Sequence, residues 1–188
     1  PGAFEGDILA AMQARIYAGG GDDPANEQVI GSGEGALMCR YYTGRRRIDA
    51  NDKLTLEFAG GYHHYHACLM RPVLIGQPAP AQRDMHAAAR DALLAAEDAL
   101  RPGEPIGAAF DAQAEVLDRA GHRGNRMNAC GYSLGATYAP TWMDGHMLYH
   151  GNLSEVRPGM VIFVHIIIFD SARGHAMPLG RTVEIQKG

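Results

Sequence analysis

The amino-acid sequence predicts an α+β domain built from two similar αβ halves. Three observations support this prediction: three segments with helical spacing of apolar residues, a small set of apolar runs typical of strands, and a loose internal repeat. The length of 188 residues suits one domain. The apolar fraction of 46% and the charged fraction of 20% are those of an ordinary globular protein.

Three segments are predicted to be helices because apolar residues recur every three to four positions. They are residues 4–18, 82–100 and 106–120. Each is followed by residues that end helices: glycines from Gly19, the pair Pro102-Gly103, and Gly121.

Four segments are predicted to be strands from their apolar and β-branched content, the last one weakly. They are residues 53–58, 61–75, 160–169 and 182–185. We expect the second to be broken at Pro72 and the third to be a fully buried central strand. The glycine-rich stretch at 31–35 follows no clear strand of a βαβ unit, so we interpret it as a loop rather than a phosphate site.

The chain also repeats itself. Residues 1–20 and 102–121 both open with Pro-Gly, carry a sixth-position glycine and end in glycine after an amphipathic segment, and five of the twenty positions are identical. Each copy is followed by a strand with one ionisable residue among apolar ones, Glu57 in the first half and His165 in the second. Two αβ halves facing each other would bring these side chains toward one cleft.

Both residues have a structural and a functional interpretation. Glu57 is either exposed on a half-buried strand or buried, and a buried carboxylate needs a partner. His165 is either a core histidine bonded to a backbone carbonyl or a general acid–base, a role that suits its ordinary pKa.

Two further motifs are weaker. Strand alternation over residues 61–71 would place His64, His66 and Cys68 on one face, but a zinc site needs a fourth ligand and no H-x-x-x-H or C-x-x-C spacing supports one. The stretch "GYSLG" around Ser133 fits the G-x-S-x-G pattern of a nucleophile elbow, which requires a strand before the serine and a helix after it. The flanking residues predict neither element.

Composition excludes several classes of partner. The net charge of −4 gives no basic surface for nucleic acid, and the apolar run at 160–169 is too short to span a bilayer. The three cysteines have neither the spacing of a metal site nor that of a disulfide framework, which is typical of reduced thiols. We therefore expect a cytoplasmic protein. The chain begins at Pro1, and we expect a single catalytic domain over 1–188 that lacks an N-terminal domain of a longer protein.

Taken together, the sequence resembles the creatinase/methionine aminopeptidase family. The matching stretches are "PGAFEGDILAAM", "LTLEFAGGYHHYHACLMR", "CGYSLGATYAPTW", "RPGMVIFVHIIIFD" and "LGRTVEI". The resemblance implies a pita-bread fold, with two pseudo-symmetric αβ halves around a curved, mainly antiparallel sheet. In the full-length protein it also implies a homodimer.

The peptidases of that family hold two metal ions with Asp, Asp, His, Glu and Glu. By the resemblance these ligand positions fall, in chain order, on Glu57, Cys68, Tyr132, His165 and a position at or next to Gly180. One carboxylate, one thiol, one phenol and one imidazole do not suit a site for hard divalent ions. We therefore expect no metal and no other cofactor, as in the metal-free creatinase and ectoine hydrolase branch.

That branch implies a hydrolase that cleaves a non-peptide C–N bond of a small amidine or guanidine carboxylate, most simply by opening the ectoine ring. The expected catalytic residues are Glu57, His165 and Tyr132, and the expected substrate-binding residues are Arg40, Arg71, His66 and Cys68. Two alternatives stay open: a metal-dependent Xaa-Pro dipeptidase, and a catalytically dead domain that binds a small molecule or a partner protein.

Overall fold

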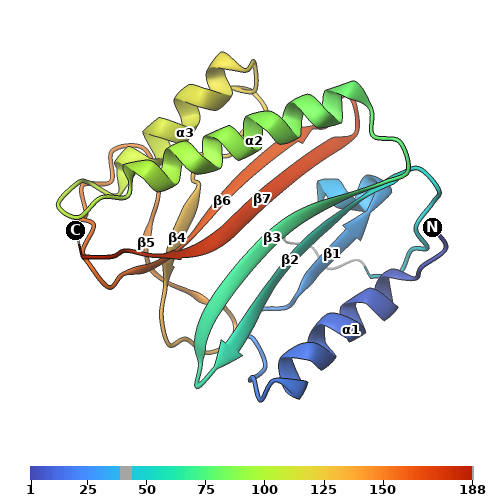
Figure 1. Ribbon diagram of the computed structural model, residues 1–188, viewed down its shortest axis with the longest axis horizontal. Helices are drawn as coiled ribbons and strands as arrows, with labels where there is room; N and C mark the ends of the chain where they lie inside the picture. Colours follow the sequence, from blue (N-terminus) through green and yellow to red (C-terminus); the bar gives the residue numbers. More distant parts are fainter. Residues whose placement is uncertain (39–43, 188) are drawn as a thin grey trace.

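A computed structural model of the chain describes residues 1–38 and 44–187 (Figure 1). These residues form one antiparallel sheet of seven strands in the order β1-β2-β3-β7-β6-β4-β5. The helices are α1 (Glu5–Ala18), the 3-10 helix η1 (Gly33–Leu37), α2 (Pro80–Ala99) and α3 (Gly107–Arg119). The strands are β1 (Val29–Ser32), β2 (Asp52–Tyr62), β3 (Tyr65–Ile75), β4 (Gly131–Leu134), β5 (Met143–Met147), β6 (Val161–Asp170) and β7 (His175–Glu184). The predicted α+β class is confirmed.

All three predicted helices are confirmed to within two residues at each end. The predicted end signals also hold, since Gly121 follows α3 in the left-handed region at φ 82°. None of the helices in the described part of the chain is both long and apolar enough to cross a membrane.

The stretch 61–75 is a hairpin and not one strand, which corrects the prediction. β2 runs to Tyr62 and β3 starts at Tyr65, so only His63 and His64 connect them. Both take positive φ, 50° and 64°, as a two-residue hairpin turn requires. His64 therefore belongs to the turn, and only His66 and Cys68 of the expected set share a strand face.

Other strand predictions need smaller corrections. β3 continues through Pro72, which lies beyond the two residues of β3 that are in register with β7. The glycine-rich stretch at 31–35 supplies the end of β1 and the start of η1. "GYSLG" forms β4, and the Ser133 Oγ accepts the N–H groups of Gly145 and His146 at 3.0 and 2.9 Å. Ser133 is thus tied into the β4–β5 pairing rather than raised on a nucleophile elbow.

The two faces of the sheet differ in what covers them. α2 lies across β6 and β7 and α3 packs against α2 (Figure 1). Alternate residues of β6 point into this helical layer: Ile162, Val164, Ile166 and Ile168. α1 packs near β1 and β2, with Ile8 and Leu9 against the buried Ile30 and Leu54. We call this helix-covered side the outer face, and the opposite side the inner face.

Candidate functional site

A single row of residues crosses four strands on the inner face. Glu57 of β2 lies opposite Met70 of β3, Met70 lies opposite Gly180 of β7, and Gly180 lies opposite His165 of β6. Residues directly opposite one another in an antiparallel sheet project from the same face. The register therefore places Glu57 and His165 on one face, as the internal repeat predicted, and both are buried.

Three strand spacings of about 4.8 Å separate the backbones of Glu57 and His165, or roughly 14 Å across a flat sheet. Gly180 lies between them without a side chain. A Cβ at this position would stand 2.9 Å from the Cβ of His165 and 2.8 Å from the carbonyl oxygen of Val164. The row thus has an ionisable group toward each end and a bare backbone beside His165.

Aromatic rings surround the His165 end of the row. Tyr132 of β4 lies opposite Phe163 of β6, and its ring centroid is 5.6 Å from those of both Phe163 and His165. Trp142 donates its indole N–H to the Tyr132 hydroxyl at 2.8 Å, and both rings are buried. Sequence reasoning missed Trp142, although it is the only tryptophan of the 188 residues and follows Tyr132 by ten positions.

Cys68 lies near the Glu57 end, on the inner face two residues before Met70. Burial raises the pKa of its thiol well above the ordinary range, and the nearby negative charge of Glu57 adds to the effect. Its backbone N–H donates to the Thr182 Oγ1 at 2.7 Å, and the Thr182 hydroxyl donates to the Cys68 carbonyl at 2.9 Å. Cys68 therefore presents a protonated thiol beside Glu57.

His66, further along the same face of β3, uses both of its ring nitrogens within the protein. Nε2 accepts the Ala25 N–H at 3.0 Å, which places the proton of the neutral ring on Nδ1, 3.2 Å from the Thr137 Oγ1. Burial lowers the pKa of this imidazole. The side chain thus joins two separate segments to β3, and its role as a substrate contact stays a prediction.

Of the two predicted arginines, Arg71 lies among the described residues and does not face the row. Arg71 follows Met70 in β3 and so projects from the outer face, where its guanidinium donates to the carbonyls of Met70 and Gly180, each at 3.1 Å. Arg40 lies outside the described residues. Of the predicted site residues, the structure gathers Glu57, Cys68, Tyr132 and His165 on the inner face, with His66 at its margin.

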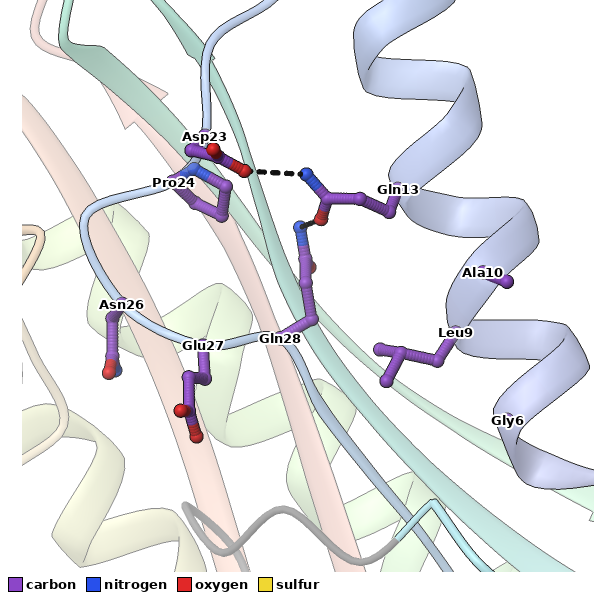
Figure 2. Close-up of a pocket in the computed structure, with 9 residues that line it drawn as sticks. All are labelled: Gly6, Leu9, Ala10, Gln13, Asp23, Pro24, Asn26, Glu27 and Gln28. Carbon is purple, nitrogen blue, oxygen red and sulfur yellow. Dashed lines mark hydrogen bonds between the residues drawn. The ribbon is translucent and has the colours of Figure 1, made fainter.

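A separate pocket of about 520 Å³ opens between α1 and residues 23–28 (Figure 2). Gln13 donates to Asp23 at 3.2 Å and accepts from Gln28 at 3.4 Å within it. Its lining is Gly6, Leu9, Ala10, Gln13, Asp23, Pro24, Asn26, Glu27 and Gln28. None of these is a predicted site residue, so this pocket is distinct from the row.

Curated relatives include two kinds of hydrolase. The chain is 31% identical over 146 residues to an uncharacterized hydrolase/peptidase, y4tM, of Sinorhizobium fredii (76% of this chain, 37% of that protein). It is 21% identical over 165 residues to an Xaa-Pro dipeptidase of Pyrococcus furiosus (86% and 47%). It is also 28% identical over 149 residues to an ectoine hydrolase of Halomonas elongata (75% and 35%). The chain spans less than half the length of these relatives.

Solved structures share the fold at low identity. The prolidase from Pyrococcus furiosus superposes with a TM-score of 0.91 at 20% identity, over 100% of this chain and 54% of that one. The X-Pro aminopeptidase from Thermotoga maritima gives 0.89 at 18% identity, over 99% and 51%. These matches confirm the predicted pita-bread fold.

A family model tests membership over nearly the whole chain. The model described as metallopeptidase family M24 matches residues 1–187. It covers both αβ halves, the strands that carry the Glu57–His165 row, and the segments that the family resemblance was drawn from. The chain therefore belongs to metallopeptidase family M24.

Proposed function

We propose that this domain hydrolyses a C–N bond in a small molecule that joins an amidinium cation to a carboxylate, with ring opening of ectoine as the reaction. The observation that carries the proposal is the inner-face row, which holds Glu57 and His165 on opposite sides of Gly180. The 28% identity to an ectoine hydrolase supports the substrate class.

Glu57 suits the recognition of a planar cation. A carboxylate binds an amidinium through two parallel hydrogen bonds, as it binds a guanidinium. Glu57 is buried, and such an interaction strengthens where water is excluded. We propose that the same carboxylate attacks the amidine carbon, or activates the water that does so.

The remaining groups handle the proton and the developing charge. In the water route, Glu57 takes a proton from the water as its oxygen bonds to the amidine carbon, and the C–N bond then breaks with its electron pair going to nitrogen. In the nucleophile route, the Glu57 oxygen forms that bond first, and water then hydrolyses the covalent intermediate and releases Glu57. His165 delivers a proton to that nitrogen. Tyr132, packed edge-on against His165, donates a hydrogen bond to charge that builds up on the tetrahedral centre. The products are an amide and an amine in one opened chain.

The metal ions that the family name implies do not fit the donors of this row. Cys68 offers a soft sulfur where hard divalent ions prefer carboxylate oxygens. Gly180 offers no donor, and Tyr132 and His165 supply a phenol and an imidazole. Within residues 1–38 and 44–187, no three or more His, Cys, Asp or Glu side chains are grouped so that they could hold a metal ion.

A metal-dependent Xaa-Pro dipeptidase is the second candidate. The similarity to the dipeptidase of Pyrococcus furiosus, which covers 86% of this chain, favours it. It requires metal, and the donor set above argues against it. Chelation therefore separates the two candidates.

The test is a proton NMR time course of ectoine with the full-length protein in excess EDTA. We expect ring opening in the wild type and a loss of about 10³-fold or more in Glu57→Gln, because the neutral amide neither pairs with the cation nor acts as base or nucleophile. Glu27→Gln, a change in the separate pocket, is the matched control and should retain activity.

The outcomes distinguish the candidates. Near-normal turnover by a folded Glu57→Gln variant would rule out the mechanism. No turnover of ectoine with EDTA, combined with metal-dependent cleavage of an Xaa-Pro dipeptide, would favour the dipeptidase. Absence of both activities would favour a domain that binds without catalysis.

A further inference from the structure

The contact between Trp142 and Tyr132 has a chemical consequence for the row. A phenolic hydroxyl carries one proton and two acceptor lone pairs. The indole N–H can only donate, so at 2.8 Å it occupies an acceptor position of the Tyr132 oxygen. The phenolic proton must therefore point away from Trp142.

The Tyr132 ring itself belongs to the inner face. Tyr132 projects from the same face as Phe163, its partner across the strands, and hence as His165 two residues further on. Its ring meets that of His165 at an interplanar angle of 62°. Trp142, Tyr132 and His165 thus stand in sequence from the loop after β4 toward the row.

The position of Trp142 is set by the other half of the molecule. The loop from β4 to Trp142 reaches the start of β3, where Ala136 bridges to Tyr65. The Thr137 N–H donates to the His64 carbonyl at 3.0 Å, and its hydroxyl lies 3.2 Å from His66 Nδ1. The first half therefore anchors the loop that carries Trp142 onto the second half.

We propose that Trp142 is a positioning residue: by donating to the Tyr132 hydroxyl, it directs the phenolic proton toward the substrate. This inference rests on the proposed function for its catalytic consequence, and on the geometry alone for the orientation of the hydroxyl. It also gives His66 a role, since His66 holds the loop that brings Trp142 into place.

The orientation is tested without any substrate. The Trp142 indole N–H resonance of the full-length protein is identified as the one lost in Trp142→Phe. In Tyr132→Phe it should move upfield and exchange faster with solvent, because its acceptor is gone. Tyr149→Phe removes a hydroxyl from an exposed ring elsewhere and should leave it in place. A resonance unmoved by Tyr132→Phe would overturn the proposal.

The catalytic consequence is tested by a double-mutant cycle on ectoine opening. Trp142→Phe should lower kcat about tenfold with little change in KM, since a misdirected hydroxyl fails mainly in the transition state. In a Tyr132→Phe background the same change should cost nothing further, because the hydroxyl is already absent. If the kcat losses of the two single variants instead multiply in the double variant, Trp142 acts by packing and the positioning role is refuted. If the wild type fails to open ectoine, the proposed function is wrong. The shift of the Trp142 indole resonance in Tyr132→Phe then still tests the orientation of the Tyr132 hydroxyl.

Discussion

Two buried ionisable side chains of the inner face, Cys68 and His66, are held in their neutral forms by their surroundings. Cys68 is kept neutral by burial and by the charge of Glu57. His66 is kept neutral by burial and by the Ala25 N–H, which occupies its Nε2. Each state leads to a measurement that does not depend on the substrate.

His66 should make the stability of the protein depend on pH. Its folded pKa lies below the ordinary value of 6.5, so the unfolded chain binds a proton first as the pH falls. The free energy of unfolding should therefore decrease below about pH 6.5 and level off once the pH passes the folded pKa. Urea unfolding between pH 5 and 8 measures this. His66→Gln, which does not titrate, should show a smaller decline, and an equal decline in both proteins would contradict the assignment.

Cys68 should be unreactive in the folded protein. Alkylation requires the thiolate, and the raised pKa leaves almost none at pH 8. Mass spectrometry of peptides after iodoacetamide treatment should find Cys68 unmodified, with full modification after denaturation. Rapid labelling of Cys68 in the native protein would show that this end of the row is open and its thiol ionised.

At the residue level, the sequence predicts part of this site. Glu57 and His165 stand out because each interrupts an apolar run, and the structure confirms that both are buried on one face. Trp142 gave no such signal, since it sits in a loop whose path depends on contacts with β3. The outer-face position of Arg71 follows from strand register, which only the long-range pairing fixes.

Among the elements, β7 depends on a glycine at one position. A Cβ at Gly180 would meet the Val164 carbonyl and the Cβ of His165 at under 3.0 Å. Gly180→Ala should therefore push β7 from β6 and lower the stability by about 1–3 kcal/mol. Gly60→Ala, in β2, meets nothing within 4 Å and is the matched control. Thermal unfolding of both variants tests this, and equal losses would show that the contact is not tight.

Secondary structure was predictable where the local signal was strong. The three helices and β6 follow from periodicity and apolar content. β1, β4 and β5 have only four or five residues each, with glycines among them, and are extended because they pair with distant strands. The turn at His63 and His64 was missed because residues other than glycine seldom take positive φ, and here two do so in succession.

Across the whole molecule, Glu5 connects three segments that are distant in sequence. Its buried carboxylate accepts from the backbone and hydroxyl of Ser32, both at 2.6 Å, and from the backbones of Arg45 and Arg46 at 2.8 and 2.9 Å. Glu5→Gln should lower the free energy of unfolding by about 2–4 kcal/mol, because an amide nitrogen would face backbone donors. Asp7→Asn, exposed on the same helix, should cost less than about 0.5 kcal/mol in chemical denaturation. Similar values for the two variants would contradict this role.

The order of the strands has a consequence for how the site forms during translation. β7 is the last strand of the described chain to be synthesised, yet it lies between β3 and β6 and joins the two halves. Until it leaves the ribosome, β3 and β6 each present an unpaired edge that can pair with another chain. A chain that ends before His175 should therefore aggregate rather than fold into a less stable domain. Gly180 arrives with that strand, so the row from Glu57 to His165 is assembled only as the sheet closes.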